Sequence, residues 1–197
     1  MSTTHKEEMQ KLQAKQRAKV AAASNPNRGL ILVHTGNGKG KSSSAFGVMV
    51  RALGWKQKVG VVQFIKGSWI TGERRFFDQL GGIIWHTMGE GFTWDTQDRV
   101  RDIKAAKMAF SKAHELMVSG NLDLLILDEI NIALRYDYLD VRSVIDSLNS
   151  RDKRTSIILT GRDAAPAICE IADLITEMTE IKHPFAAGIK AQRGIDF

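Results

Sequence analysis

A glycine-rich turn between an apolar run and a helical pattern constrains the fold of this chain more than any other feature. The run "GLILVHTG" (29–36) has the continuous apolar character of a buried parallel strand, and "KSSSAFGVMVRALG" (41–54) reads as a helix closed by a glycine. The turn "GNGKGKS" between them ends as the phosphate-binding consensus G-x-x-x-x-G-K-[ST] does. Thr35 stands at the leading glycine position, with Gly36 displaced by one. The order of strand, loop and helix predicts a phosphate-binding loop.

Each residue type in this loop suits a triphosphate. Glycines allow backbone N–H groups to point inward around an anion, and the helix N-terminus adds a partial positive charge. Lys41 offers a charge to phosphate oxygens, and the Ser42 hydroxyl offers a ligand to magnesium. We therefore expect ATP to be bound by Gly36, Asn37, Gly38, Lys39, Gly40, Lys41 and Ser42. The alternative is a strand-to-helix turn that binds nothing.

The rest of the chain alternates between strand and helix patterns. Five further stretches are expected to be strands, at 58–67, 83–88, 122–130, 155–162 and 176–182. Helices are expected between them, at 73–81, about 95–119, 141–149 and 164–175. The alternation predicts an α/β fold of the P-loop NTPase type, with a mostly parallel sheet of about six strands covered by helices on both faces. Ligands of such sheets bind at the carboxyl ends of the strands.

The apolar stretch "LDLLILDEI" ends in two acids, Asp128 and Glu129. A buried strand that ends in carboxylates is typical of the Walker B element, in which an acid holds magnesium directly or through water. We therefore predict Ser42, Asp128 and Glu129 as the metal ligands, and the sequence does not distinguish which acid binds directly. The alternative is that the two acids cap a helix that begins near Asn131.

Two aromatic residues lie in the loop "GEGFTWDTQDR". Phe92 and Trp94 are one residue apart, so in extended backbone they project to the same side. From the residues alone, the simpler interpretation is that they anchor the loop in the core. They could also staple the following long helix, whose N-cap is expected at Asp95 or Thr96.

The net charge of +6 is concentrated at the N-terminus. Residues 1–28 contain only two acids, Glu7 and Glu8, and six basic residues: Lys6, Lys11, Lys15, Arg17, Lys19 and Arg28. We predict a basic helical arm over 1–27 and a single domain over 28–197. The arm has little apolar surface, and an isolated helix of that kind is only marginally stable in water. We therefore expect the arm to order only against the body or a ligand, or else to remain a solvated tail.

Composition excludes several other classes of protein. With one cysteine, Cys169, the chain has neither an intrachain disulfide nor a thiolate zinc site. No apolar run approaches the roughly 18 residues that span a bilayer, and no signal-peptide pattern is present. We expect a cytoplasmic protein that binds no membrane. Because the body is nearly balanced in charge, it is a poor match to a nucleic-acid-binding face.

Several motifs in one order resemble the P-loop-type ATP:corrinoid adenosyltransferases. They are "TGNGKGKS", "VGVVQFIKGSW", "GFTWDTQ", "LDLLILDE", "RYDYL", "TGR" and "KHPFAAGIKAQRGIDF". The similarity extends from about Arg28 to Phe197. It implies that Co(I) of a corrinoid attacks the 5′-carbon of ATP, with magnesium present, and that inorganic triphosphate leaves.

The resemblance also implies roles for individual residues. Lys41 would act on the leaving triphosphate and Asn37 would contact the sugar end of the nucleotide. Phe92 and Trp94 would displace the lower axial ligand of the corrinoid, which makes reduction to Co(I) easier. Residues 1–27 would cover the corrinoid site. The family further implies a homodimer and an electron-donating, flavodoxin-like reductase as partner.

Two other functions are compatible with parts of the sequence. An ordinary P-loop ATPase or small-molecule kinase would also carry the acidic pair, but would release ADP rather than triphosphate. A non-enzymatic module could use the basic arm to bind RNA or DNA, although no aromatic–basic RNA motif or recognition helix supports it.

Overall fold

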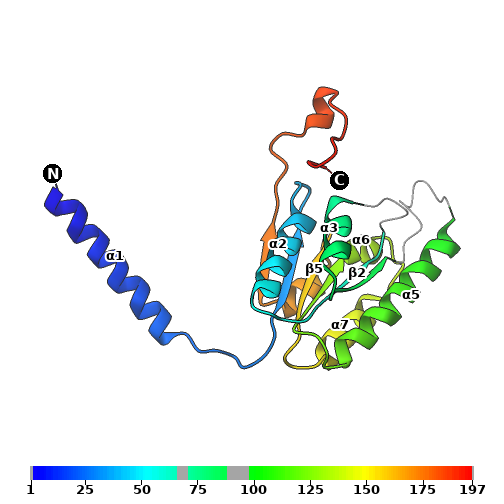
Figure 1. The fold of residues 1–197 in the computed structure, drawn as a ribbon, viewed down its shortest axis with the longest axis horizontal. Helices are drawn as coiled ribbons and strands as arrows, with labels where there is room; N and C mark the ends of the chain where they lie inside the picture. The colour runs from blue at the N-terminus through cyan, green and yellow to red at the C-terminus, as the bar shows by residue number, and fades with distance from the viewer. Residues whose placement is uncertain (1, 66–70, 88–97, 197) are drawn as a thin grey trace.

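The computed structural model describes residues 2–65, 71–87 and 98–196 (Figure 1). At its centre is a six-stranded sheet in the order β3-β2-β4-β5-β1-β6. The strands are β1 (Ile31–Thr35), β2 (Val59–Gln63), β3 (Ile84–Thr87), β4 (Leu124–Asp128), β5 (Ser156–Thr160) and β6 (Leu174–Glu177). Every neighbouring pair is parallel. The predicted parallel α/β sheet is confirmed, and all the strands deliver their carboxyl ends to the same edge.

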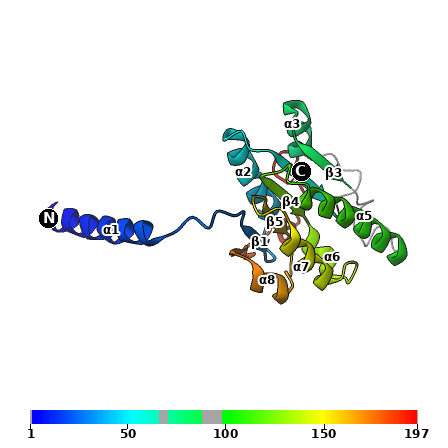
Figure 2. The ribbon, with the colours of Figure 1, turned by 90° about the horizontal axis from the view of Figure 1, so that it is seen from below.

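Helices cover both faces of this sheet, as Figure 2 shows. One face carries α2 (Lys41–Gly54) and α3 (Gly72–Leu80), and the other carries α5 (Arg99–Val118), α6 (Ile130–Arg135), α7 (Val141–Ser150) and α8 (Pro166–Ile171). Strand β4 shows why two layers form, because its side chains alternate between them. Ile126 packs with Met49 of α2, whereas Leu125 and Leu127 belong to the core beneath α5 and α7.

The long helix α5, predicted at about 95–119, buries one apolar face. Ala106, Ala113 and Met117 are buried in the core, and Ile103 and Phe110 pack against it. The predicted N-cap at Asp95 or Thr96 is wrong. Asp98 caps the helix, since its carboxylate accepts hydrogen bonds from the N–H groups of the second and third helical residues at 3.1 Å.

The last helix and strand begin and end elsewhere than predicted. The helix expected at 164–175 ends at Ile171, and β6 occupies Leu174–Glu177 rather than 176–182. Leu174 and Ile175 pair with Leu32 and Val33 of β1, so the parallel ladder uses residues whose apolar spacing also fitted a helix. Tertiary pairing decides between the two periods in such short apolar runs.

The N-terminal helix α1 (Ser2–Ala22) stands away from the rest of the molecule (Figures 1 and 2). Residues 4–28 are all exposed. We expected this segment to order only against the body or a ligand, and in this single chain it is helical without packing on the body. Its composition supplies the reason, because helix-forming residues dominate and pairs such as Glu7 and Lys11 are spaced at i, i+4. Within the described residues, no helix is long and apolar enough to cross a membrane.

Candidate active site

The glycine-rich loop turns tightly between β1 and α2. Gly40 occupies the N-cap of α2 with φ 109°, a left-handed conformation that side-chain-bearing residues rarely adopt. A Cβ on Gly38 would lie 2.8 Å from the carbonyl carbon and oxygen of Thr179, so only glycine fits there. The N–H of Gly38 donates to the carbonyl of Met178 at 2.7 Å. The segment after β6 therefore supports the loop from one side.

Thr35, which replaces the consensus leading glycine, has a structural role. Its hydroxyl accepts a hydrogen bond from the N–H of Ala164 at 3.1 Å, and its carbonyl accepts one from the N–H of Met178 at 2.8 Å. The threonine thus ties the start of the loop to the segments that follow β5 and β6. Glycine at this position would lose the first of these two links.

Lys41 is buried at the base of the loop, with 8% of its surface exposed. Its Nζ donates to the carbonyl of Gly38 at 2.5 Å. Burial lowers the pKa of Lys41, and the negative charge of Glu129 partly opposes that shift. A cation in this position is largely shielded from water and is held among backbone dipoles, so an anionic phosphate oxygen is the partner that fits it.

Lys39, the other lysine of the loop, is held differently. Its side chain is about half exposed and forms an ion pair with Asp196, near the C-terminus. The hydrogen bond from Lys39 is the main cause that lowers the pKa of the Asp196 carboxyl. Figure 1 shows the C-terminal segment returning over this end of the sheet. The charge of Lys39 is therefore already partnered, whereas that of Lys41 meets a neutral carbonyl.

The two acids follow β4 and differ in burial. Asp128 is fully buried, while Glu129 is half-buried and has φ 65°, which is strained for a residue with a side chain. Glu129 takes the N-cap position of α6, but its side chain makes no capping hydrogen bond. The alternative of a helix cap therefore does not describe Glu129. Its charge acts on the Lys41 ammonium, which brings the acidic pair to the phosphate loop.

These residues fit a magnesium ion bound together with a nucleotide. Magnesium takes one or two carboxylates and completes its shell with phosphate oxygens and water. Ser42, at the first turn of α2, adds a half-buried hydroxyl to the two acids. In the part of the chain that the structure describes, no group of three or more His, Cys, Asp or Glu residues could hold a metal alone. The donor set suits a metal that arrives with a triphosphate.

Gln63 and Thr160, two buried polar residues that sequence reasoning missed, contact Asp128. The Gln63 Nε2 donates to Asp128 Oδ2 at 2.9 Å, and the Thr160 hydroxyl donates to Asp128 Oδ1 at 2.8 Å. Each ends an otherwise largely apolar strand. A polar residue at the carboxyl end of such a strand was the signal that could have identified them.

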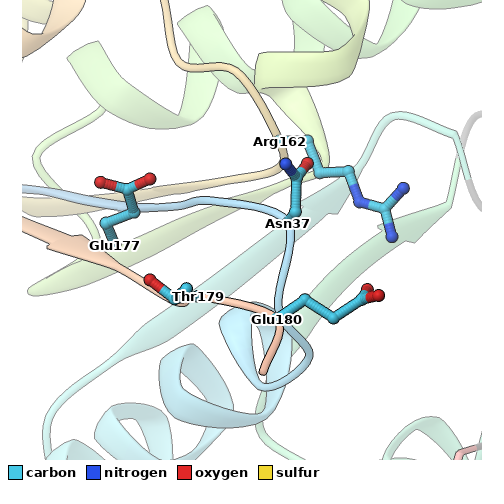
Figure 3. Close-up of a pocket in the computed structure, with 5 residues that line it drawn as sticks. All are labelled: Asn37, Arg162, Glu177, Thr179 and Glu180. Carbon is cyan, nitrogen blue, oxygen red and sulfur yellow. The ribbon is translucent and has the colours of Figure 1, made fainter. Parts of the chain in front are cut away.

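A polar pocket of about 420 Å³ adjoins the loop (Figure 3). Its lining residues are Asn37, Arg162, Glu177, Thr179 and Glu180. They come from the loop, the turn after β5, and the end of β6 with the residues that follow, so three neighbouring carboxyl ends meet here. In Figure 3, Arg162 and Glu180 extend to the same side of Asn37. Only Asn37 among them was predicted as a site residue.

Comparison with known proteins assigns the family. A family model described as ATP:corrinoid adenosyltransferase BtuR/CobO/CobP matches residues 27–197. The chain belongs to this family. A protein from Pseudomonas aeruginosa named corrinoid adenosyltransferase is 50% identical over 194 residues, covering 98% of this chain and 95% of that protein. A protein of the same name from Sinorhizobium sp is 48% identical, covering 92% of this chain and 86% of that protein. Another from Escherichia coli (strain K12) is 43% identical, covering 98% of this chain and 97% of that protein.

Membership of this family of adenosyltransferases confirms the resemblance drawn from the motifs. It also confirms that the protein is an enzyme and not a non-enzymatic binding module. The individual site residues remain predictions. Phe92 and Trp94 lie in the segment 88–97, outside the described residues. The described part of the candidate site comprises the glycine-rich loop, the acidic pair and the adjoining polar pocket.

Proposed function

We propose that this corrinoid adenosyltransferase uses its glycine-rich loop to hold the triphosphate of ATP as a leaving group. The observation that carries the proposal is the buried Lys41 ammonium, which lies within its own loop and within electrostatic reach of Glu129. The Lys41 ammonium supplies positive charge to the phosphates, and Glu129 is close enough to share a magnesium ion with them. A hydrolytic enzyme must in addition present the terminal phosphate to water, which adenosyl transfer does not require.

The reaction balances as a nucleophilic displacement at carbon. The electron pair of Co(I) forms the bond to the 5′-carbon of ATP, the bond from that carbon to the triphosphate oxygen breaks, and its electron pair leaves on inorganic triphosphate. Negative charge therefore grows at the end of the triphosphate that joins the ribose. Lys41 and the N-terminus of α2 stabilise that charge. Ser42, Asp128 and Glu129 would hold magnesium, which would supply further positive charge to the phosphates.

The polar pocket is the proposed place of the nucleoside. Asn37 belongs both to the loop and to this pocket, so a nucleotide whose phosphates fill the loop can extend its ribose past Asn37. Glu177, Glu180 and Thr179 offer acceptors for ribose hydroxyls, and the Arg162 guanidinium is a donor and a flat surface for a base. ATP with its sugar at this edge presents the 5′-carbon toward the corrinoid.

Three further proposals concern the corrinoid side of the enzyme. Phe92 and Trp94 fill the space below the corrin ring and exclude the lower ligand. The basic arm 1–27 covers the corrinoid. A flavodoxin-like reductase donates the electron that reduces cobalt to Co(I). The working unit is a homodimer, which light scattering of the purified protein would test. These proposals are supported by the family resemblance of the motifs.

Product analysis tests the proposed function. The protein is incubated with ATP, magnesium and cobalamin that has been chemically reduced to Co(I). The expected products are a light-sensitive adenosylated corrinoid and inorganic triphosphate in equal amounts. Release of ADP and phosphate without alkylated cobalt would instead assign an ATPase. A second arm supplies Co(II) and a mild protein reductant: Phe92→Ala and Trp94→Ala are expected to fail there and to recover much of their activity with preformed Co(I).

A further inference from the structure

A hydrogen-bond network connects four adjacent strands at their carboxyl ends. Trp85 and Thr87 of β3 contact Gln63 of β2, which contacts Asp128 of β4, which contacts Thr160 of β5. Strand register sets this order, because Gln63 is paired with Thr87 on one side and with Asp128 on the other. Gln63 is 4% exposed, and Asp128 and Thr160 are fully buried, so water does not compete for the contacts of Gln63 and Thr160 with Asp128.

The chemistry of the donors fixes the orientation of the Gln63 amide. The indole Nε1–H of Trp85 can only donate, and it lies 3.0 Å from Gln63 Oε1. The Thr87 hydroxyl lies 3.0 Å from the same oxygen. The amide oxygen therefore faces β3, and the amide NH₂ must face Asp128, to whose Oδ2 it donates at 2.9 Å.

The Thr160 hydroxyl is oriented by the same logic. It accepts a hydrogen bond from the backbone N–H of Glu129 at 2.9 Å, so its own proton is free to be donated to Asp128 Oδ1, 2.8 Å away. Both oxygens of Asp128 thus receive a donor from a neighbouring strand. The contact with the Glu129 N–H lies at the residue whose backbone is left-handed, so it also supports that strained turn.

We infer that Gln63 is a positioning residue for the acidic pair. Trp85 anchors the Gln63 amide, and Gln63 and Thr160 together fix the plane of the Asp128 carboxylate. The fixed carboxylate in turn holds the backbone turn that directs Glu129 toward the phosphate loop. The inference rests on one part of the proposed function, namely that the acidic pair binds the magnesium ion that accompanies the triphosphate. Residues that orient metal-binding carboxylates strengthen metal binding without contacting the metal. The signature of Gln63 is therefore a change in magnesium dependence, not in nucleotide affinity alone.

Calorimetric titration of ATP binding against magnesium concentration tests this role without requiring turnover. Gln63→Met keeps the length of the side chain and removes both hydrogen-bonding groups. We expect it to raise the magnesium concentration for half-maximal ATP binding roughly tenfold, and to change magnesium-free ATP affinity far less. Gln57→Met, at an exposed position before β2, is the matched control and should leave the magnesium dependence unchanged.

A milder variant keeps the test decisive if Gln63→Met does not fold. Trp85→Phe removes the indole donor and retains a smaller aromatic ring beside Phe46 and Phe77, whose centroids lie 5.4 and 6.0 Å from that of Trp85. It should shift magnesium dependence in the same direction, by about two- to threefold. Unchanged magnesium dependence in the folded variant would overturn the inference. If the parent protein binds ATP with magnesium but does not alkylate cobalt, the proposed function fails while this test still gives its answer.

Discussion

At the scale of single residues, the two lysines of the glycine-rich loop differ in burial and in partner, although they belong to one sequence motif. Lys39 reaches outward and is paired with Asp196, while Lys41 is buried and held by a backbone carbonyl. A buried ammonium without a carboxylate in hydrogen-bond contact is costly to maintain, and burial lowers its pKa. The triphosphate proposed to bind here would provide the negative charge that this site lacks.

Replacement of Lys41 separates these roles experimentally. We expect Lys41→Ala to weaken ATP binding and to reduce adenosyl transfer by about two to three orders of magnitude, because the preorganised positive charge that stabilises the leaving triphosphate is lost. Lys39→Ala should cost much less, since the charge of Lys39 is already neutralised by Asp196. Steady-state kinetics and calorimetry with ATP measure both. Equal losses in the two variants would contradict the assignment of Lys41 as the phosphate-binding lysine.

The candidate site residues that belong to a local sequence motif could be predicted from the sequence, and those whose place depends on the order of the strands could not. Consensus spacing identified the loop and the acidic pair, since both follow recognisable apolar strands. Gln63 and Thr160 were missed because their role depends on strand order: β2 and β5 flank β4 only in the folded sheet. Arg162 was missed for the same reason, as no local pattern indicates that the turn after β5 lies beside Asn37.

At the scale of elements, the entry into β1 is tied to the start of β6. Asp173 accepts hydrogen bonds from both terminal nitrogens of Arg28, at 2.8 and 2.5 Å, and from the N–H of Ile31 at 2.9 Å. The hydrogen bond from Arg28 is the largest cause that lowers the pKa of Asp173 to about 2. This contact places the edge strand β6 in register with β1, where sequence periodicity alone favoured a longer helix.

The Asp173 pair makes stability depend on pH in a defined direction. A carboxylate whose pKa is lowered on folding stabilises the folded state fully above its ordinary pKa near 4, and that contribution is lost as the pH falls through 2. Asp173→Asn should therefore lower the free energy of unfolding at pH 7 by about 1 kcal/mol, allowing for partial exposure. The deficit should shrink progressively below pH 4.

Urea denaturation between pH 3 and 7 measures this difference. Asp78→Asn is the control, because Asp78 makes an exposed i, i+4 pair with Arg74 on α3 and should contribute only a few tenths of a kcal/mol. A deficit for Asp173→Asn that stays constant down to pH 3 would show that the variant disturbs the packing of the strand rather than its charge pair.

At the scale of the whole molecule, charge and packing are divided between a body and an arm. The body contains the described core and site, whereas α1 projects from it with every residue from 4 to 22 exposed. Most of the net positive charge lies on the first 28 residues. The helical character of the N-terminal segment was predictable from its composition. The position of the arm was not, because a helix with so weak an apolar stripe has no preferred surface to pack on.

Deletion of residues 2–27 tests what the arm does. Because residues 4–22 of α1 are all exposed, the shortened protein should keep its thermal midpoint and its affinity for ATP with magnesium. If the arm covers the bound corrinoid, the dissociation constant for cobalamin should rise several-fold. Replacement of Lys11, Lys15 and Lys19 by Gln is the matched control, since it retains the helix length and removes charge only. A smaller loss in that variant assigns the effect to coverage, and an equal loss assigns it to charge. Cobalamin binding as tight as in the full chain would make the arm a solvated tail.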